Sequence, residues 1–402
     1  MLYEIGTNRI LIICLARCMV KLECASRSTI SPTYKSIIIL MSNKYIYTHK
    51  LTLSTLNLNH NSYTMKISSF IVTIIIISFS MSVFADDYSS IALKIPSLED
   101  LSAIGDDLSY SFYHERCHDV EGIIYRKVKE WVYKEPTLAP SLLRLQYHDC
   151  VVRGCDASIL LGHEGSEKTA NASKSLRGFE VIDDIKAEIE KHCPKTVSCA
   201  DILTAVARDA TVLAGGPYWT VPYGRKDGRV SLAKEAEIVP KGSESVTNLI
   251  EFFQSKGLNV LDLVVLSGAH TIGRATCESV QHRLYDYKGT NKPDPSLDPK
   301  YLNYLRRKCR WASENVHLDG ETPDTFDTQY YHNLKKNMGL LSTDQLLYTD
   351  SRTKPIATGL SFESSLFKNQ FGVSMVKLAS ILDYTSQDDG EIRVDCKYVN
   401  QY

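Results

Sequence analysis

The segment "LLRLQYHDCVVRGCDAS", residues 142–158, contains two side chains suited to acid–base chemistry. Arg144 and His148 are four residues apart, so on a helix they share one face. A neutral imidazole can take and return a proton, and a guanidinium can stabilise a developing negative charge. Both are uncommon in an apolar helix, because burying a charge needs compensation. Alone, they favour a structural role, with Arg144 in an ion pair and His148 hydrogen-bonded in the core.

His270, in "LVVLSGAHTIGR", is the second candidate. It follows an apolar stretch and the small residues Ser-Gly-Ala, which let a bulky group approach the backbone. A histidine of this kind is more often structural than a ligand when nothing accompanies it. Here Asp344 stands inside a further predicted apolar helix, "LLSTDQLL", at 340–347. A carboxylate that accepts the Nδ1–H of a histidine is the usual support for a metal-bound imidazole.

Oxygen-bearing side chains form two further groups. Carboxylates, hydroxyls and carbonyls without sulfur or nitrogen suit a hard ion such as calcium. Neither group follows the helix-loop-helix calcium pattern, and Asp and Ser in turns often serve only local capping. The first group is Asp149, Asp156 and Ser158 with the carbonyls near Val152 and Gly154, and the second is Thr271, Asp319, Thr322 and Asp327.

The charge of the chain is uneven along its length. Residues 1–85 hold eight of the 46 Lys and Arg but two of the 47 Asp and Glu, which leaves 38 against 45, a net charge of −7, for residues 86–402. An acidic body of this kind argues against nucleic acid as a partner.

The stretch "MKISSFIVTIIIISFSMSVFADD" has the features of a secretory signal at 65–85. One lysine precedes an apolar run, and small residues stand at the expected cleavage positions. The run is too short to favour a membrane span. We therefore expect an upstream extension at 1–64 outside the mature protein, a polar lead-in at 86–107 and a folded domain at 108–402. The chain ends soon after Cys396 without an apolar tail, which favours secretion to the cell wall over the vacuole.

Eight cysteines follow the signal: Cys117, Cys150, Cys155, Cys193, Cys199, Cys277, Cys309 and Cys396. An even number in a secreted chain indicates four disulfides, with 105 possible pairings from sequence alone. Asn171 begins the only Asn-x-Ser/Thr sequon, in a polar segment suited to an exposed, glycosylated loop.

Hydrophobic spacing predicts a mainly helical fold. A strand is indicated at 218–224, "YWTVPYG", turning at 226–228 as a small hairpin. No Pro-, Gly- or Ser-rich linker divides 108–398, so one continuous unit is expected. Helices are predicted at 120–135, 141–150, 181–192, 200–214, 245–258, 261–270, 299–309, 327–336 and 368–382.

Six stretches taken together resemble the secretory plant haem peroxidases, the class III family. They are residues 144–158, "SCADILTAVARDA", "LVVLSGAHTIGR", "TPDTFDTQYY", "GLLSTDQLL" and "GEIRVDC", in the order and spacing of that family, and the resemblance covers 108–402. It implies two helical lobes around one haem b. It also implies the disulfides Cys117–Cys193, Cys150–Cys155, Cys199–Cys396 and Cys277–Cys309.

The resemblance implies a role for each candidate histidine. His148 would be the distal acid–base residue, with Arg144 stabilising charge beside it, while hydrogen peroxide is reduced to water through a ferryl haem intermediate. His270 would be the proximal iron ligand, supported by Asp344. Small phenolic donors would return the enzyme to rest in one-electron steps. A monomer is expected, with no nucleic acid partner and no membrane association after signal removal.

Two calcium ions are implied as well. The distal ion would take Asp149, Val152, Gly154, Asp156 and Ser158, and the proximal ion Thr271, Asp319, Thr322, Thr325 and Asp327. Pro240 matches the proline at the entrance for aromatic donors. Asp201 and Arg225 match a buried structural ion pair.

Four positions depart from the family pattern, and one of them is Val151, which replaces a phenylalanine. Gln146 replaces a histidine and is expected to be peripheral. Tyr147 replaces the phenylalanine that walls the distal pocket, so it could be oxidised or alter donor access. The asparagine that orients the distal histidine is missing, since Ala172 or Ser173 falls near its position and Asn171 belongs to the sequon. A slower reaction with peroxide is therefore expected.

Two other functions compete with this interpretation. A metallohydrolase built on His148 and His270 would bind zinc, although no tight zinc motif is present. A secreted, calcium-bound wall protein on a decayed peroxidase scaffold would bind haem poorly.

Overall fold

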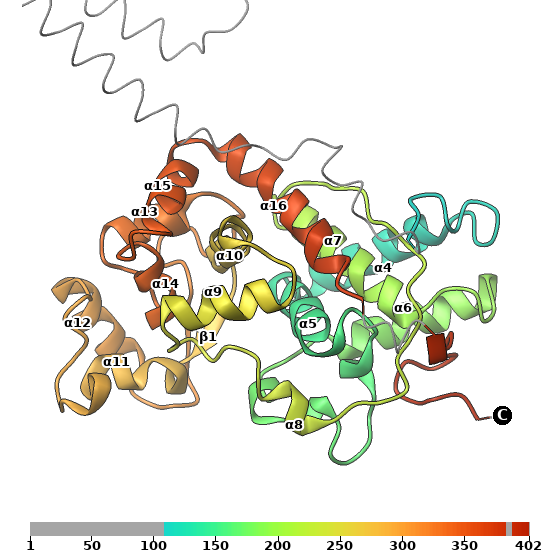
Figure 1. Cartoon of the computed structure of the whole chain (residues 1–402), viewed down its shortest axis with the longest axis horizontal. Coiled ribbons are helices and arrows are strands. Elements are labelled where there is room, and N and C mark those ends of the chain that lie inside the picture. The colour runs from blue at the N-terminus through green and yellow to red at the C-terminus, as the bar shows by residue number, and fades with distance from the viewer. Residues whose placement is uncertain (1–107, 383–387, 402) are drawn as a thin grey trace, which may run out of the picture. The chain divides into compact units, whose positions relative to one another are not determined.

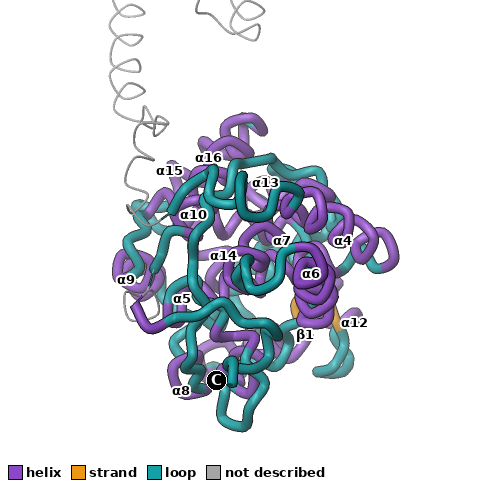
Figure 2. The backbone as a smooth tube through the Cα atoms, turned by 90° about the vertical axis from the view of Figure 1, so that its right-hand side faces the viewer, coloured by secondary structure: helices purple, strands orange, loops and turns teal. Residues whose placement is uncertain are grey.

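The computed structural model describes residues 108–382 and 388–401, all within the unit Leu93–Tyr402. The expected extension, signal and lead-in, at 1–64, 65–85 and 86–107, lie outside the described residues. The described part consists mostly of α-helices, with one two-stranded sheet (Figures 1 and 2). The fold is therefore mainly α, as expected. No helix in this part is long and apolar enough to cross a membrane.

Each predicted helical stretch contains a helix, although boundaries shift by a few residues. Three helices that were not predicted, α8, α11 and α15, are short or weakly patterned. The helices are α4 (Val120–Lys134), α5 (Leu138–Arg153), α6 (Phe179–His192), α7 (Cys199–Leu213), α8 (Ala233–Ala236), α9 (Val246–Ser255), α10 (Val260–Ser267), α11 (Gln281–Tyr285), α12 (Pro299–Lys308), α13 (Gln329–Lys335), α14 (Ser342–Leu347), α15 (Lys354–Phe362) and α16 (Ser364–Ala379).

Helix α7 forms the centre of the main hydrophobic core. Its residues 199–211 are all buried, including the charged side chains of Asp201, Arg208 and Asp209. The N-cap Ser198 accepts a hydrogen bond from the backbone N–H of Asp201 and so satisfies one free donor of the first turn. Helices α4, α5 and α6 pack against α7. This packing holds α5, which carries Arg144 and His148, in a fixed orientation.

Helix α9 links the two candidate histidine regions. It packs against α10, which leads to His270, and against α14, which carries Asp344 (Figure 1). Its Phe253 ring stacks with Tyr147 of α5, with ring centroids 6.5 Å apart. A second, smaller core joins α11, α12 and the sheet through Leu284, Leu305 and Val316.

The sheet does not lie where the sequence indicated. Strands β1 (Arg274–Thr276) and β2 (Asn315–His317) pair antiparallel, with Ala275 opposite Val316. Residues 218–224 form no strand, and Tyr223 makes only an isolated bridge with Ser109. The hairpin prediction at that position was wrong. The apolar alternation there reflects burial of an irregular segment, with Val221 and Tyr223 in the core.

Four disulfides connect the described chain, and they are the pairs that the resemblance implies. Cys199–Cys396 joins the start of α7 to the C-terminal segment across 197 residues. Cys150–Cys155 closes a loop directly after α5. Cys117–Cys193 and Cys277–Cys309 complete the set. Closing long loops restricts the unfolded chain, so these links stabilise the fold.

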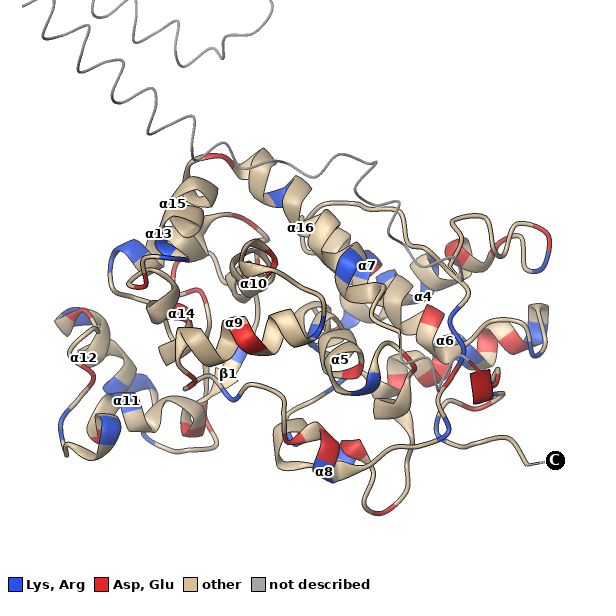
Figure 3. Cartoon of the chain, in the orientation of Figure 1, with Lys and Arg blue, Asp and Glu red and all other residues tan. Residues whose placement is uncertain are grey.

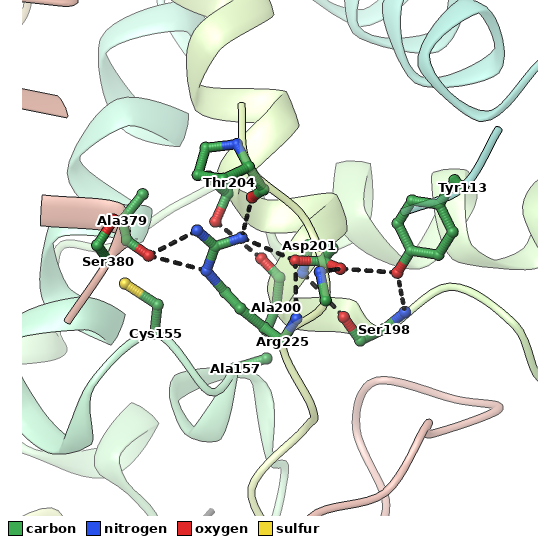
Figure 4. A network of polar contacts seen from close by, with 12 residues as sticks. Tyr113, Cys155, Ala157, Ser198, Ala200, Asp201, Thr204, Arg225, Ala379 and Ser380 are labelled. Carbon is green, nitrogen blue, oxygen red and sulfur yellow. Dashed lines mark hydrogen bonds and ion pairs between the residues drawn. The ribbon is translucent and has the colours of Figure 1, made fainter. Parts of the chain in front are cut away.

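Asp201 and Arg225 form a fully buried ion pair with an N–O distance of 2.8 Å (Figure 4). The Tyr113 hydroxyl donates to the same carboxylate at 2.7 Å. The Arg225 guanidinium also donates to the carbonyls of Ala379 and Pro222. These bonds supply the partners that a buried charge needs, and they connect α7 with the end of α16.

Candidate active site

Helix α5 places His148 in the protein interior. Leu142, Leu145 and other apolar residues anchor its buried side, and Gly154 ends it with a φ of 90°, which only glycine adopts easily. The His148 side chain is 3% exposed. Burial, helped by the positive charge of Arg144, lowers the pKa of His148 to about 3. The imidazole is therefore neutral at ordinary pH and able to accept a proton.

The Nδ1 atom of His148 is buried and has no hydrogen-bond partner among the described residues. The hydroxyl of Ser173 is in the same condition. Asn171 is exposed and its backbone N–H donates to Glu237, so its side chain does not fill a buried position beside His148. Among the described residues, none therefore contacts His148 in place of the asparagine that the family pattern has there.

Arg144 lies on the same face of α5 as His148, and two of its properties are typical of a residue that lines a cavity. It is solvent-accessible, yet the protein around it lowers its pKa by desolvation. Its Nη1 donates to the Ser175 hydroxyl at 2.9 Å, and its Nη2 to the Ala172 carbonyl at 3.4 Å. The segment after Asn171 thus holds the guanidinium in place.

Tyr147 packs between α5 and α9. Its ring lies edge-on to His148 at 6.1 Å and stacked on Phe253. Burial, and then the charge of Glu244, raise the pKa of its phenol, which stays protonated. Gln146 is buried in α5, with 1% exposure, and its expected place away from the distal pocket stays a prediction. Sequence reasoning could not place it, because the neighbours of one residue on a helix come from other segments.

His270 belongs to the short 3-10 helix η5 (Gly268–Thr271), which follows α10. A side chain at Gly268 would meet the Tyr331 hydroxyl at 2.4 Å and Phe367 at 2.6 Å, so the close packing requires glycine. The Nδ1 of His270 lies 2.7 Å from Oδ1 of Asp344. With Nδ1 protonated toward this carboxylate, Nε2 keeps its lone pair and can bind a metal ion.

Three acidic side chains, Asp149, Asp156 and Glu167, lie close together near the C-terminal end of α5. Asp149 and Asp156 were predicted, whereas Glu167 was missed, and no spacing signal marked it. Burial, with the Asp156 charge, raises the pKa of Asp149 well above its usual value. Burial likewise raises the pKa of Glu167 to about 8. Both Glu167 oxygens and the Ser158 hydroxyl lack hydrogen-bond partners in the described part, so a cation fits this set.

The loop around this acidic group is tightly built. A side chain at Gly228 would come within 2.2 Å of an Asp156 carboxylate oxygen, so only glycine leaves room for that carboxylate. The Val152 carbonyl accepts a 3.4 Å hydrogen bond from Lys256, and the Gly154 carbonyl accepts from the N–H of Asp156. Each carbonyl retains a second lone pair for a metal ion.

The second oxygen set also comes together. Asp327 accepts hydrogen bonds from the hydroxyls of Thr271 and Thr322, both at 3.2 Å. The Thr271 hydroxyl also lies 3.5 Å from the Thr325 carbonyl. Asp319 is buried, its Oδ2 has no hydrogen-bond partner in the described part of the chain, and burial raises its pKa.

No three His, Cys, Asp or Glu side chains converge as a ready metal site within residues 108–382 and 388–401. The two oxygen sets fit calcium only as mixtures of carboxylate, hydroxyl and carbonyl groups. Such mixtures are usual for calcium, which accepts six to eight oxygen ligands.

Pro240 is half-buried in the loop between α8 and α9. A hollow of about 600 Å³ begins three residues further on, at Ser243, and Glu244 also lines it. Lys288, Arg352 and His282 contribute its basic side chains. Pro240 does not line this hollow. Because Glu244 also acts on Tyr147, the hollow and the distal helix approach each other at this residue.

A mainly helical fold with a histidine and an arginine on one helix, and a carboxylate-supported histidine elsewhere, has the layout of a haem peroxidase. The family model described as "Peroxidase" matches residues 124–362. Peroxidase 7 of Arabidopsis thaliana is 56% identical over 73% of this chain and 84% of its own length. Peroxidase 69 of the same plant is 45% identical over 72% and 88%, and Peroxidase N1 of Nicotiana tabacum 42% over 74% and 92%.

The chain belongs to the class III peroxidase family. It is a haem peroxidase that reduces hydrogen peroxide. The family implies haem and usually calcium, and its members are typically secreted. The zinc-hydrolase and non-enzymatic alternatives are left without support.

Proposed function

We propose that this enzyme is secreted to the cell wall, binds one haem b and two calcium ions, and uses hydrogen peroxide to oxidise small phenolic donors. The observation that carries the assignment is the 2.7 Å contact between His270 and Asp344. In the same fold, Arg144 and a neutral His148 share one face of α5. We expect the mature enzyme to be a monomer without a nucleic acid partner.

The residues present fit a haem held through His270. The ring is 35% exposed while its Asp344 partner is buried, so the imidazole is oriented by the protein and open on its Nε2 side. Bound haem would supply a redox-active iron that peroxide oxidises and phenols reduce. The Asp344 carboxylate strengthens the imidazole as a donor, which favours the more oxidised iron.

His148 and Arg144 would carry the proton and charge steps of peroxide cleavage. The neutral imidazole takes the proton from one peroxide oxygen and returns it to the other, which leaves as water. The guanidinium of Arg144 stabilises the negative charge that grows on the leaving oxygen. Because Nδ1 of His148 has no partner in the described part, the base is less well oriented, and we expect a slow reaction with peroxide.

Phenolic donors would enter near Pro240 and Tyr147. Tyr147 offers an aromatic surface beside His148, and its phenol is itself oxidisable. The calcium ions would hold geometry rather than perform chemistry. The distal set directly follows His148 and the proximal set begins at Thr271, next to His270, so loss of either ion would disturb a histidine.

The test is a visible spectrum of the protein from Asp86 onward, refolded oxidatively with hemin and calcium. One equivalent of hydrogen peroxide and then guaiacol are added. A Soret band that falls, shifts and recovers with guaiacol supports the proposal. A ferric spectrum that does not change when peroxide is added would contradict the role assigned to His148. A folded protein that retains no haem would contradict the role assigned to His270.

A further inference from the structure

Helix α12 carries two tyrosines, one buried and one at the surface, whose rings are stacked. Tyr301 is 5% exposed and Tyr304 is 40% exposed. They are three residues apart, which brings their side chains together on the helix. Their ring centroids are 6.1 Å apart, with an angle of 15° between the planes. The pair therefore connects the interior with the surface through two phenols that can be oxidised.

The hydroxyl of Tyr301 is not needed for packing. It is buried and has no hydrogen-bond partner in the described part of the chain. A buried hydroxyl without a partner costs free energy, and a phenylalanine ring would fill the same space without that cost. Because a phenol differs from the phenylalanine ring in being easier to oxidise, the hydroxyl points to a redox role for Tyr301.

The inner end of the pair lies near the residues that support His270. Tyr301 belongs to the second core, against which Leu341 packs, and Leu341 donates its N–H to Asp344. Burial raises the pKa of the Tyr301 phenol, while the charge of Arg283 opposes this shift and that of Asp344 adds to it. Tyr301 is thus within electrostatic reach of the carboxylate that contacts His270 at 2.7 Å.

The outer end of the pair is held rigidly among positive charges. Asp298 caps α12 by accepting the backbone N–H groups of Lys300 and Tyr301, which fixes the turn that carries both rings. Lys300 and Lys308 lie four residues to either side of Tyr304, and Figure 3 shows the basic residues of this helix. Positive neighbours disfavour a further positive charge, so an oxidised Tyr304 would release its proton to the surrounding water.

Access to Tyr304 differs from access to the distal histidine. His148 is 3% exposed, so only small molecules reach its surroundings. The Tyr304 ring is at the surface, where a phenolic group can touch it even when that group belongs to a large polymer. The two positions therefore suit donors of different size.

We propose that Tyr304 is a second oxidation site, at which the enzyme oxidises phenolic groups of polymers too large to reach the haem. The inference rests on the peroxidase function proposed above. Tyr304 would pass an electron through Tyr301 to the haem that peroxide has oxidised, and would release its proton to water. The Tyr304 radical would then take a hydrogen atom from a phenol of the polymer, which restores Tyr304 and leaves a phenoxyl radical. Two such steps use both oxidising equivalents of one peroxide, which becomes two molecules of water.

The first measurement locates the radical. Haem-loaded enzyme is mixed with peroxide without a donor and frozen within milliseconds for electron paramagnetic resonance. A second sample reacts with a nitroso spin trap and is digested with trypsin. Cleavage after Lys300 and Arg306 releases the peptide 301–306, whose fragment masses distinguish an adduct on Tyr301 from one on Tyr304. We expect the adduct on Tyr304, and Y304F should lose most of the organic radical signal.

The second measurement compares a large donor with a small one. Tyramine coupled to dextran presents phenols on a polymer, and guaiacol is the small donor. Y304F and Y301F should each lose most of the rate with tyramine–dextran while oxidising guaiacol as fast as the wild type. Two controls should leave both rates unchanged: Y133F, which removes an 89% exposed tyrosine from α4, and W311F, which alters an exposed ring just after α12.

The inference is overturned if Y304F oxidises tyramine–dextran as fast as the wild type, or if the adduct lies elsewhere and Tyr304 is unmodified. Equal loss in W311F would also overturn it, because the surface of α12 would then only hold the polymer. Guaiacol separates the two proposals. A wild-type enzyme that oxidises guaiacol but not tyramine–dextran contradicts the second oxidation site alone, whereas one that oxidises neither donor contradicts the peroxidase function as well.

Discussion

The Nδ1 atom of His270 lies 2.7 Å from the Asp344 carboxylate, which is itself held by two further hydrogen bonds. The Tyr330 hydroxyl donates to Oδ1 at 3.0 Å and the Leu341 N–H to Oδ2 at 2.9 Å. A carboxylate fixed in this way cannot turn away from the histidine. The ring orientation of His270 is therefore set by α13 and α14 rather than by its own short helix.

Asp344→Asn should weaken the support of His270. The carboxamide is neutral and a poorer acceptor, so we expect haem affinity or activity to fall about 10- to 100-fold. The iron reduction potential should rise, because the imidazole donates less charge. Hemin titration and potentiometry measure both. Tyr330→Phe removes a bond to Asp344 but keeps His270 paired, so its effect should be smaller. Equal effects of the two variants would contradict the assignment.

Without calcium, stability should fall as pH rises. The folded state raises the pKa of Glu167 from 4.5 to about 8 and also raises that of Asp149. At pH values between 4.5 and about 8, the folded chain keeps a proton on Glu167 that the unfolded chain has released. Each such carboxyl lowers the free energy of unfolding by about 1.4 kcal/mol for every pH unit of rise. Melting temperatures with chelator, measured across this range, should decrease. Added calcium, or Glu167→Gln, should flatten the profile.

Gly228→Ala should disturb the acidic group of Asp149, Asp156 and Glu167, although Gly228 lies far from these residues in the sequence. The new methyl group would lie 2.2 Å from an Asp156 oxygen, so the carboxylate must move. We expect about 1–3 kcal/mol of destabilisation, typical of overpacking, and weaker calcium binding. Calorimetry with a calcium titration measures both quantities. Gly162→Ala, whose methyl group would find its nearest atoms 3.8 Å away and whose φ is not positive, adds a methyl group without a clash and serves as the control. Unchanged calcium affinity in Gly228→Ala would argue against Asp156 as a ligand.

His148→Leu should slow the reaction with peroxide by about 10²- to 10⁴-fold, the usual contribution of a general base. Haem binding should persist, because the iron ligand is on another element. Stopped-flow absorbance with limiting peroxide gives the rate constant. Arg144→Leu should also slow the reaction, while Tyr147→Phe should leave it close to the wild type. A wild-type rate in His148→Leu would assign the proton transfer elsewhere.

Asp201→Asn should destabilise the fold by about 3–5 kcal/mol, because it leaves Arg225 charged and buried without its counterion. Denaturant unfolding measures the change. Glu130→Gln breaks the exposed pair with Lys134 and should cost less than about 1 kcal/mol. If Asp201→Asn and Glu130→Gln lowered the free energy of unfolding by similar amounts, burial would not explain the contribution of the Asp201–Arg225 pair.

The sequence was informative where one short segment carries the signal. Arg144 and His148 are four residues apart on a helix whose apolar pattern is clear, so their shared face could be predicted. The helices α4, α6, α7 and α9 followed in the same way. The resemblance then supplied what spacing could not, including the disulfide pairs and the role of His270 as an iron ligand.

The rest depends on contacts between distant segments. Glu167 lies 18 residues after Asp149 and gave no pattern, yet it completes the acidic group. The burial of Gln146 could not be predicted either, because helical spacing alone does not tell which neighbours cover a face. The irregular segment at 218–224 alternates like a strand, but Tyr223 bridges to Ser109, and Asp227 in the expected turn bridges to Glu391, so no hairpin forms.

The hydrogen-bond network around Arg225 couples exposure of this segment to opening of the whole core. The amides of Gly224 and Arg225 donate to the buried Asp201 carboxylate, and the guanidinium reaches the Ala379 carbonyl at the end of α16 (Figure 4). Exposing either amide to solvent would separate the charges of Asp201 and Arg225 in the dry interior. Local unfolding of one segment is therefore not enough for these amides to exchange. Their deuterium uptake should report opening of the whole core, whereas amides near Tyr287 should exchange through small local motions.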